Sequence, residues 1–275
     1  MSHFVNFVNI NANVTSSRLQ FTMRNGGHTL FTGAVNIDRT ITVNMRSINS
    51  LVLSNNRKTA SVEDSSIFSD LYPQIAHAAD MAMILNFAAA LPLPVLDSLG
   101  FNNVSGMVTK FGGSLPPRLN LVSELVYSFR NANASIYRQL FQIWKDGCHS
   151  LAGIEGLQVQ YLVQPQPVTN GTNSLGQAAG ETEAVIGLVT LSFDNALDEE
   201  KALNGLRSIV SSHMAVLQRA GLYIPFKYLN YADKSQDPFS SYGKQSKTFL
   251  KGVSRRYDPT GLFQTSIPGS FKLFA

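Results

Sequence analysis

The sequence predicts an α+β fold in which a small β-rich lobe precedes a larger domain, an antiparallel sheet covered by helices. Segments with strand patterns and segments with helical patterns occur in runs, without the strict strand–helix alternation of a parallel α/β fold. The chain has 275 residues, of which 44% are hydrophobic. This is enough to build a sizeable core in one large or two modest domains.

The first part of the chain contains mainly short strand patterns. Residues 40–45 (Thr-Ile-Thr-Val-Asn-Met) alternate polar and apolar side chains, which is typical of a half-buried strand. The turn-rich residues 54–58 separate two short apolar runs and therefore predict a hairpin. Ile67, Leu71 and Ile75 are spaced by four residues, as on one face of a helix. We expect strands over residues 19–23 and 40–45, a hairpin over residues 51–62 and a short helix over residues 63–75.

The second part carries longer elements. Residues 156–163 alternate as a strand, and residues 185–193 form a nearly continuous apolar run that is typical of a buried strand. Residues 198–220 predict a helix, since acidic residues occupy its first turns and Gly221 follows its end. We expect strands over residues 120–129, 156–163 and 185–193, helices over residues 134–147 and 198–220, and a loop over residues 169–183.

The first candidate binding motif is Arg24-Asn25-Gly26-Gly27-His28, directly after the first predicted strand. Two adjacent glycines let the backbone adopt positive φ and approach a bulky ligand closely. Successive N–H groups in such a turn can point at a phosphate, and an arginine can bind a phosphate through two hydrogen bonds. The alternative is an ordinary glycine turn with a solvated histidine.

Residues 19–75, with this motif near their start, resemble the first half of the flavin-binding domain of berberine-bridge-enzyme-like, FAD-linked oxidoreductases. In this family an Arg-Ser-Gly-Gly-His loop lies against the FAD pyrophosphate, and its histidine commonly bonds to the isoalloxazine ring. Asn25 stands where the family usually has Ser. The resemblance implies FAD as cofactor, with Arg24, Asn25, Gly26 and Gly27 at its pyrophosphate and His28 as the point of covalent attachment.

Tyr228-Leu229-Asn230-Tyr231 and the closing residues 256–264 carry the second part of the resemblance. On a strand, Tyr228 and Asn230 would share one face. In the family, a tyrosine and an asparagine at these positions face the flavin, and the tyrosine often takes a hydroxyl proton as hydride leaves the substrate. A phenol has a pKa of about 10, so such a base needs nearby positive charge or a partner on the flavin. Alternatively, Tyr228 is a strand tyrosine whose hydroxyl is merely hydrogen-bonded.

The resemblance is interrupted after Ile75. A full-length relative would continue with the second half of the flavin-binding domain, whereas residues 84–275 already resemble its substrate domain. The resemblance therefore implies a truncated FAD-binding lobe at residues 1–83 and a substrate domain at residues 84–275.

The missing half-domain leaves the apolar faces of the first lobe without their usual cover. Such faces must be buried against another element. In the family the C-terminal segment returns to the flavin-binding domain, so the resemblance implies that residues 263–274 replace that cover. We also expect this packing to keep the Gly26–Gly27 turn near Tyr228 and Asn230.

Two functions from different classes follow from this organisation. The first is an FAD-linked oxidoreductase that oxidises or oxidatively cyclises a small secondary metabolite, as fungal members of the family do. The second is a flavin-free descendant that catalyses a non-redox cyclisation or isomerisation, or an inactive homologue. The missing half-domain is the reason for the second hypothesis, because FAD held on one side only would lose much of its buried area.

Other functions are disfavoured by composition. The net charge is +4 and the basic residues are scattered, so we expect no nucleic-acid partner. The single cysteine, Cys148, and the isolated His77, His149 and His213 do not form a metal motif, and we expect Cys148 to be a small buried residue. We expect a soluble, cytoplasmic protein with a small-molecule substrate, since residues 76–94 are too short and broken to span a membrane and no signal peptide is visible.

Overall fold

A computed structural model of the chain describes residues 19–27, 29, 31, 33–38, 40–55, 60–63, 65–66, 121–166, 168–269 and 271–275. Over these residues the protein is an α+β structure, as the sequence predicts. The predicted domain boundary near residue 83, His77 and residues 76–94 lie outside the described residues, as does His28.

The larger body is built on a four-stranded antiparallel sheet with the strand order β6-β7-β5-β8. The central strand β7 (Ala184–Phe193) is buried along most of its length, as its continuous apolar sequence predicts. It pairs over its whole length with β5 (Leu121–Arg130) and on its other side with β6 (Gln158–Pro165). The edge strand β8 (Tyr223–Ile224) is short. All three long strands occur where the sequence predicts strands.

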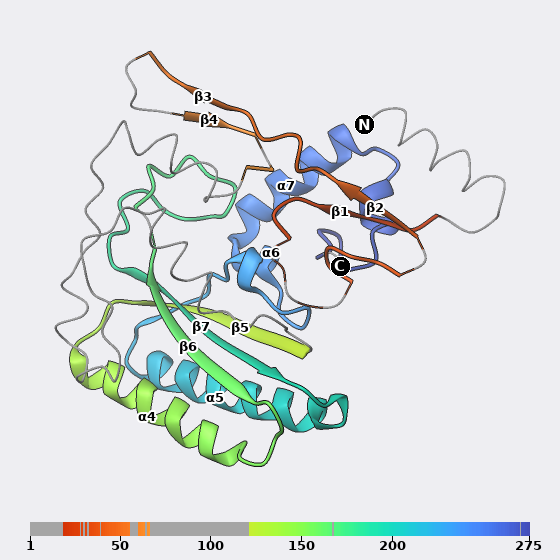
Figure 1. The fold of residues 1–275 in the computed structure, drawn as a ribbon. Coiled ribbons are helices and arrows are strands. Elements are labelled where there is room, and N and C mark those ends of the chain that lie inside the picture. Colours follow the sequence, from red (N-terminus) through yellow and green to blue (C-terminus); the bar gives the residue numbers. More distant parts are fainter. Residues whose placement is uncertain are drawn as a thin grey trace.

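Two long helices cover one face of this sheet (Figure 1). Helix α4 (Ala134–Ser150) begins where the side chain of Asn133 accepts hydrogen bonds from the backbone N–H groups of Ser135 and Ile136. Helix α5 (Glu199–Arg219) follows a single 3₁₀ turn, η2 (Ala196–Asp198). It ends before Gly221, whose φ of 69° is left-handed. The core between helices and sheet includes Leu125, Tyr127, Phe129, Leu140, Val189, Leu191, Leu206 and Leu217.

The opposite face of the sheet, called the open face below, carries no long helix among the described elements. Side chains alternate along a strand, so the neighbours of Leu125 and Tyr127 point to this face. A smaller apolar cluster lies there, formed by Val126, Ile186, Leu188 and Ala232, and Tyr228, Tyr231 and Phe271 pack against it.

The N-terminal lobe consists of two small sheets, as its strand patterns predict. β1 (Phe21–Arg24) pairs in parallel with β2 (Ile41–Asn44), and β3 (Leu51–Leu53) forms an antiparallel hairpin with β4 (Ala60–Val62). The helix predicted over residues 63–75 lies outside the described residues from 67 onwards, and residues 65–66 form a turn and an irregular segment.

The C-terminal segment covers this lobe, which confirms the prediction for residues 263–274. Phe21, fully buried, packs edge-to-face against Phe263 of α8 (Leu262–Thr265), with 6.0 Å between ring centroids. The Phe21 N–H donates to the Ser266 carbonyl at 2.9 Å. Figure 1 shows β1 and β2 beside this end of the chain. A buried Phe side chain contributes about 1.5–3 kcal/mol, so this contact stabilises the packing of the lobe against the C-terminal segment.

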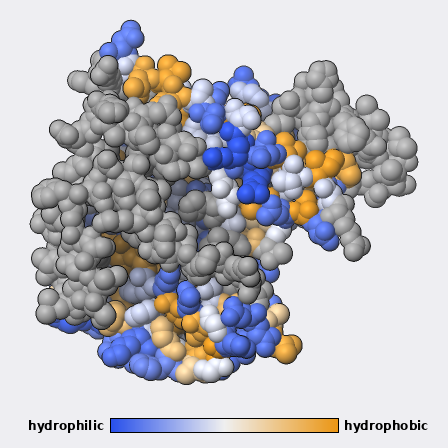
Figure 2. All heavy atoms as spheres, in the orientation of Figure 1, coloured by the Kyte–Doolittle hydropathy of each residue, from blue (hydrophilic) through white to orange (hydrophobic). Residues whose placement is uncertain are grey.

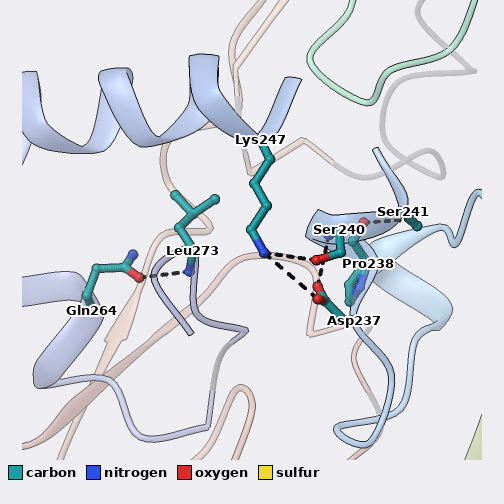
Figure 3. Close-up of polar contacts among 7 residues, drawn as sticks. All are labelled: Asp237, Pro238, Ser240, Ser241, Lys247, Gln264 and Leu273. Carbon is teal, nitrogen blue, oxygen red and sulfur yellow. Dashed lines mark hydrogen bonds and ion pairs between the residues drawn. The ribbon is translucent and has the colours of Figure 1, made fainter. Parts of the chain in front are cut away.

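Two helices connect the open face to this terminal segment. α6 (Pro238–Ser241) is capped by Asp237, whose Oδ1 accepts from the Ser240 N–H at 2.9 Å. Lys247 of α7 (Gly243–Tyr257) donates to the Ser240 hydroxyl at 2.9 Å and lies 3.9 Å from the Asp237 carboxylate (Figure 3). No residue of α7 is fully buried, and Figure 2 shows a hydrophilic area over this helix.

One local prediction was wrong. Residues 228–230 do not form a strand: Tyr228 precedes a 3₁₀ turn, η3 (Leu229–Tyr231), closed by a hydrogen bond from the Tyr231 N–H to the Tyr228 carbonyl at 3.0 Å. The alternation of polar and apolar residues here is too short to distinguish the two structures. Cys148 was expected to be buried and is only partly so.

Candidate functional site

The predicted phosphate-binding turn lies at the end of β1. Arg24 is the last residue of this strand, and Gly27 has a φ of 71°, a left-handed conformation that glycine adopts without strain. A Cβ atom built on Gly27 would lie 3.4 Å from Arg24 Nε, so the guanidinium group folds beside the glycine. Arg24, Asn25 and Gly26 are exposed residues. The turn therefore places a cation at the surface of the lobe, beside a glycine in a left-handed conformation.

A cavity of about 540 Å³ lies beside this turn. Its size is within the range of about 300–1,000 Å³ that is typical of small-molecule sites. A hydrogen bond from the buried Thr22 hydroxyl to the Ala34 carbonyl, 3.1 Å long, ties one wall to β1. Gly27 and Thr29, the neighbours of His28 in the sequence, both contribute to the lining. The lining residues are Gly27, Thr29, Phe31, Gly33, Val35, Asn36, Ile37 and Asp38.

The open face of the sheet forms the second part of the candidate site. The strand register places three residues side by side in each of three rows. The middle row is apolar, and the rows on either side of it carry a carboxyl group, hydroxyls and amides. The rows are Glu124–Thr190–Gln160, Val126–Leu188–Leu162 and Ser128–Ile186–Gln164.

Tyr228 and Asn230 meet at this face, although not through a strand. Asn230 Nδ2 donates a hydrogen bond to the Tyr228 hydroxyl oxygen at 3.0 Å. The 3₁₀ turn also brings Tyr231 edge-to-face against Tyr228, with 5.1 Å between ring centroids, and the Tyr231 hydroxyl donates to Gln164 Oε1 at 3.3 Å. Burial raises the pKa of Tyr228, and the hydrogen bond from Asn230 opposes this shift because it stabilises the phenolate.

Glu124 was missed in the sequence, although a charged residue within an apolar strand is a visible signal. Only 5% of its surface is exposed. Burial raises the pKa of its carboxyl group to about 8, and the negative charge of Asp233 adds to this shift. Asp233 itself accepts hydrogen bonds from the Ser235 N–H at 2.9 Å and the Ser235 hydroxyl at 2.6 Å. Two carboxyl groups in different environments therefore lie beside the tyrosines.

Phe271 connects the cavity with the open face. Its ring packs edge-to-face against Phe31 of the cavity lining at a centroid distance of 5.5 Å. It also packs against the apolar cluster on which Tyr228 lies. A single aromatic side chain of the C-terminal segment thus contacts both parts of the candidate site, which supports the expectation that the two parts lie near each other.

The histidine of α5 belongs to the core on the other side of the sheet. His213 is fully buried; its Nε2–H donates to the Leu140 carbonyl at 2.7 Å, and its Nδ1 accepts from the Tyr127 hydroxyl at 2.8 Å. Burial lowers the pKa of His213 to about 4, so the ring is neutral at physiological pH. We interpret this group as structural.

Over the described residues, no group of three or more His, Cys, Asp or Glu side chains could hold a metal ion. None of the helices in the same part of the chain is both long and apolar enough to cross a membrane.

Known proteins similar to this chain include FAD-dependent monooxygenases of fungi. One from Cochliobolus heterostrophus is 34% identical over 123 residues, which cover 45% of this chain and 23% of that protein. One from Fusarium proliferatum is 37% identical over 102 residues, which cover 36% of this chain and 20% of that protein. The matched residues therefore span less than a quarter of the length of either relative. No family model matches the chain.

These relatives confirm the predicted resemblance: over the matched residues, the chain is related to the FAD-dependent oxidoreductases of fungi. Among solved structures, 6-hydroxy-D-nicotine oxidase from Arthrobacter nicotinovorans is similar with a TM-score of 0.45 and 19% identity, over 78% of this chain and 45% of that chain. The individual roles of Arg24, Asn25, Gly26, Gly27, His28, Tyr228 and Asn230 stay predictions.

Proposed function

We propose that this chain acts as an FAD-linked oxidoreductase on a small secondary metabolite, which it oxidises or oxidatively cyclises. The observation that carries the proposal is the cavity beside the Gly27 turn, with the Arg24 guanidinium next to it. The relatives named above are FAD-dependent, which supports the same cofactor here.

The residues around the cavity fit a dinucleotide that carries a pyrophosphate. A Cβ at position 27 would enter the space beside Arg24, so the turn leaves room that a phosphate oxygen can use. Arg24 would neutralise the phosphate charge, and the N–H groups of residues 25–27 would bind its oxygens. Phe31, Val35 and Ile37 supply apolar surface for a ring system. His28 would be the point of covalent attachment.

On the open face, the protein's own residues would bind the substrate and move its protons. When bound, FAD supplies the hydride acceptor of the reaction. Tyr228 and Asn230 would orient a substrate hydroxyl group, and Asn230 would stabilise the Tyr228 phenolate through its existing hydrogen bond. The apolar middle row of the sheet would hold the carbon skeleton of the substrate.

FAD titration of the purified protein tests this function. We expect yellow protein, quenched flavin fluorescence on binding, and colour that survives acid precipitation. Arg24→Ala should weaken FAD binding by at least tenfold, because a charge-assisted hydrogen bond to phosphate contributes about 1.5–3 kcal/mol. Arg138→Ala, on the exposed side of α4, removes the same charge elsewhere and should bind FAD like the wild type.

His28→Ala separates attachment from binding. We expect this variant to bind FAD but to release the flavin in acid. A wild-type protein that stays colourless in excess FAD would contradict the proposed function. Turnover of a small molecule without flavin or oxygen would then favour the flavin-free cyclase or isomerase.

A further inference from the structure

Helix α7 exposes a stripe of apolar side chains. Phe249, Val253 and Tyr257 follow one another at a spacing of four residues, so they lie along one side of the helix. Their exposed fractions are 60%, 38% and 73%. A surface helix normally turns its apolar stripe towards the core, and apolar groups gathered at the surface mark a site of interaction.

The side of α7 that packs against the protein is the more polar one. The half-buried positions of the helix are Ser246, Lys247, Leu250, Lys251 and Ser254, of which only Leu250 is apolar. Lys247 donates from this side to the Ser240 hydroxyl and lies 3.9 Å from the Asp237 carboxylate. The usual polarity of a surface helix is therefore reversed in α7, and packing against the protein's own core does not account for the exposed stripe.

The same helix is strongly basic. Its sequence contains Lys244, Lys247, Lys251, Arg255 and Arg256 and no acidic residue. Within the described part of the chain, only Lys247 of this group forms an ion pair. Asp258, which follows the helix, is used by α8, since its carboxylate oxygens accept from the N–H groups of Leu262 at 2.8 Å and Phe263 at 3.0 Å. The other positive charges of α7 therefore favour an anionic partner outside the chain.

Cations and aromatic rings lie side by side on this surface. Lys251 Nζ and the guanidinium carbon of Arg255 each lie 5.4 Å from the centroid of the Phe274 ring, which is 44% exposed. The guanidinium carbon of Arg256 lies 5.4 Å from the centroid of the Tyr257 ring. These distances are typical of cation–π contacts. A partner that fits this surface must accept positive charges and apolar rings together.

An anionic membrane surface has both properties. Its lipid headgroups attract Lys and Arg, and aromatic rings prefer the boundary between headgroups and acyl chains. A stable protein–protein interface takes about 800 Å² from each partner. α7 has 15 residues and is therefore a narrow strip about 22 Å long. A strip of this size suits weak, peripheral contact with a membrane better than a stable protein complex.

We propose that α7 and Phe274 bind the protein peripherally to a membrane surface rich in anionic lipids. The helix lies parallel to the membrane plane, with Phe249 and Tyr257 among the headgroups and Arg255 and Arg256 at the lipid phosphates. This inference is independent of the proposed function, because none of these residues belongs to the cavity beside Gly27 or to the open face.

Sedimentation of the full chain with lipid vesicles tests the proposal. We expect binding to phosphatidylcholine vesicles that contain about 30% phosphatidylserine, and at least about a hundredfold weaker binding to phosphatidylcholine alone. The double variant Arg255→Gln/Arg256→Gln should weaken binding about 25-fold, since each basic residue near an anionic surface contributes about fivefold. The matched control Arg138→Gln/Lys145→Gln removes two exposed charges from α4 and should bind like the wild type.

Phe249→Ser separates insertion of the ring from attraction by charge alone. This variant should bind the anionic vesicles about tenfold more weakly, because 60% of the side chain is exposed and would leave water on binding. Leu197→Ser, at an apolar residue that is 91% exposed in η2, is the control and should bind like the wild type.

Three results would overturn the proposal. The first is wild-type protein that does not bind the anionic vesicles, which would leave an acidic protein as the partner of α7. The second is vesicle binding that neither the arginine variant nor Phe249→Ser weakens. The third is a dimer, seen by sedimentation without vesicles, that Phe249→Ser dissociates, because the surface would then be an interface between two copies of this chain.

Discussion

Gly269→Ala tests whether the C-terminal segment holds the two parts of the candidate site together. A Cβ on Gly269 would lie 1.6 Å from the Gly33 carbonyl oxygen and 2.7 Å from the Ala34 nitrogen. Side-chain carbons do not approach other atoms closer than 3.0 Å, so the two segments must separate by about 1.4 Å. Overpacking of this kind costs about 1–3 kcal/mol, and loss of the Phe31–Phe271 contact adds about 0.5–1.5 kcal/mol. We expect a total destabilisation of about 3 kcal/mol, concentrated in the N-terminal lobe.

Urea unfolding and limited proteolysis measure this effect. In Gly269→Ala, we expect rapid cleavage within the N-terminal lobe while the four-stranded sheet and α4 and α5 stay protected. Gly252→Ala is the matched control, because a Cβ there meets nothing within 4 Å and the residue lies inside α7; it should be neutral or stabilise by up to about 1 kcal/mol. If Gly269→Ala resists protease as well as wild type does, the segment does not hold the lobe and the composite site is refuted.

Three further predictions concern the turn, the core and the open face. Gly27→Ala should weaken FAD binding, measured by fluorescence titration, at least tenfold more than the control variant Gly180→Ala. Both glycines have a left-handed φ (71° and 74°), but a Cβ at Gly180 would meet nothing within 4 Å. The pKa of His213 is lower in the folded than in the unfolded state, so the free energy of unfolding should fall by up to about 3 kcal/mol as the pH drops from 6.5 towards 4. Urea unfolding of the His213→Gln variant should not show this loss of stability between pH 6.5 and 4. The pKa of Glu124 is higher in the folded than in the unfolded state, so the wild-type protein loses stability as the pH rises from 4.5 to 8. At pH 7 the Glu124→Gln variant should therefore be more stable than wild type by up to about 3 kcal/mol, and this difference should vanish near pH 4. Equal stability of Glu124→Gln and wild type at both pH values would contradict a buried, strained carboxyl group.

The sequence predicted the larger body well because its elements are long and their patterns unambiguous. The continuous apolar run of β7 requires burial on both faces of the sheet. Helices α4 and α5 cover one face, and the apolar cluster that contains Val126 and Ala232 lies on the other. α5 has an apolar stripe over six turns, so its ends were predicted to within one residue. Patterns of this length leave few alternative structures.

The candidate site was harder to predict because it depends on contacts between distant residues. Tyr228 and Asn230 were expected to meet on a strand, and they meet instead because a 3₁₀ turn brings them together. Glu124 was missed because its pKa is raised first by burial, which no local pattern reveals, and then by Asp233, 109 positions further along the chain. Sequence patterns indicate which residues face a core, but they do not indicate which polar groups from distant parts of the chain lie close together in it.

The C-terminal segment gives the two flavin-related motifs a physical connection that the sequence alone leaves open. The Gly27 turn lies on the N-terminal lobe, and Tyr228 packs against the open face of the four-stranded sheet. Among the described residues, Phe271 contacts both Phe31 of the cavity lining and the apolar cluster beside Tyr228. A ligand that fills the cavity and reaches the open face would bind only when this segment is docked. Binding and docking must then stabilise each other to the same extent, since coupling between two equilibria is reciprocal. FAD at one hundred times its Kd would stabilise the docked state by about 2.7 kcal/mol, close to the cost worked out for Gly269→Ala. Excess FAD should therefore restore protease resistance to that variant if the cofactor spans both parts, and should leave it unprotected if the cavity and the tyrosines serve separate ligands.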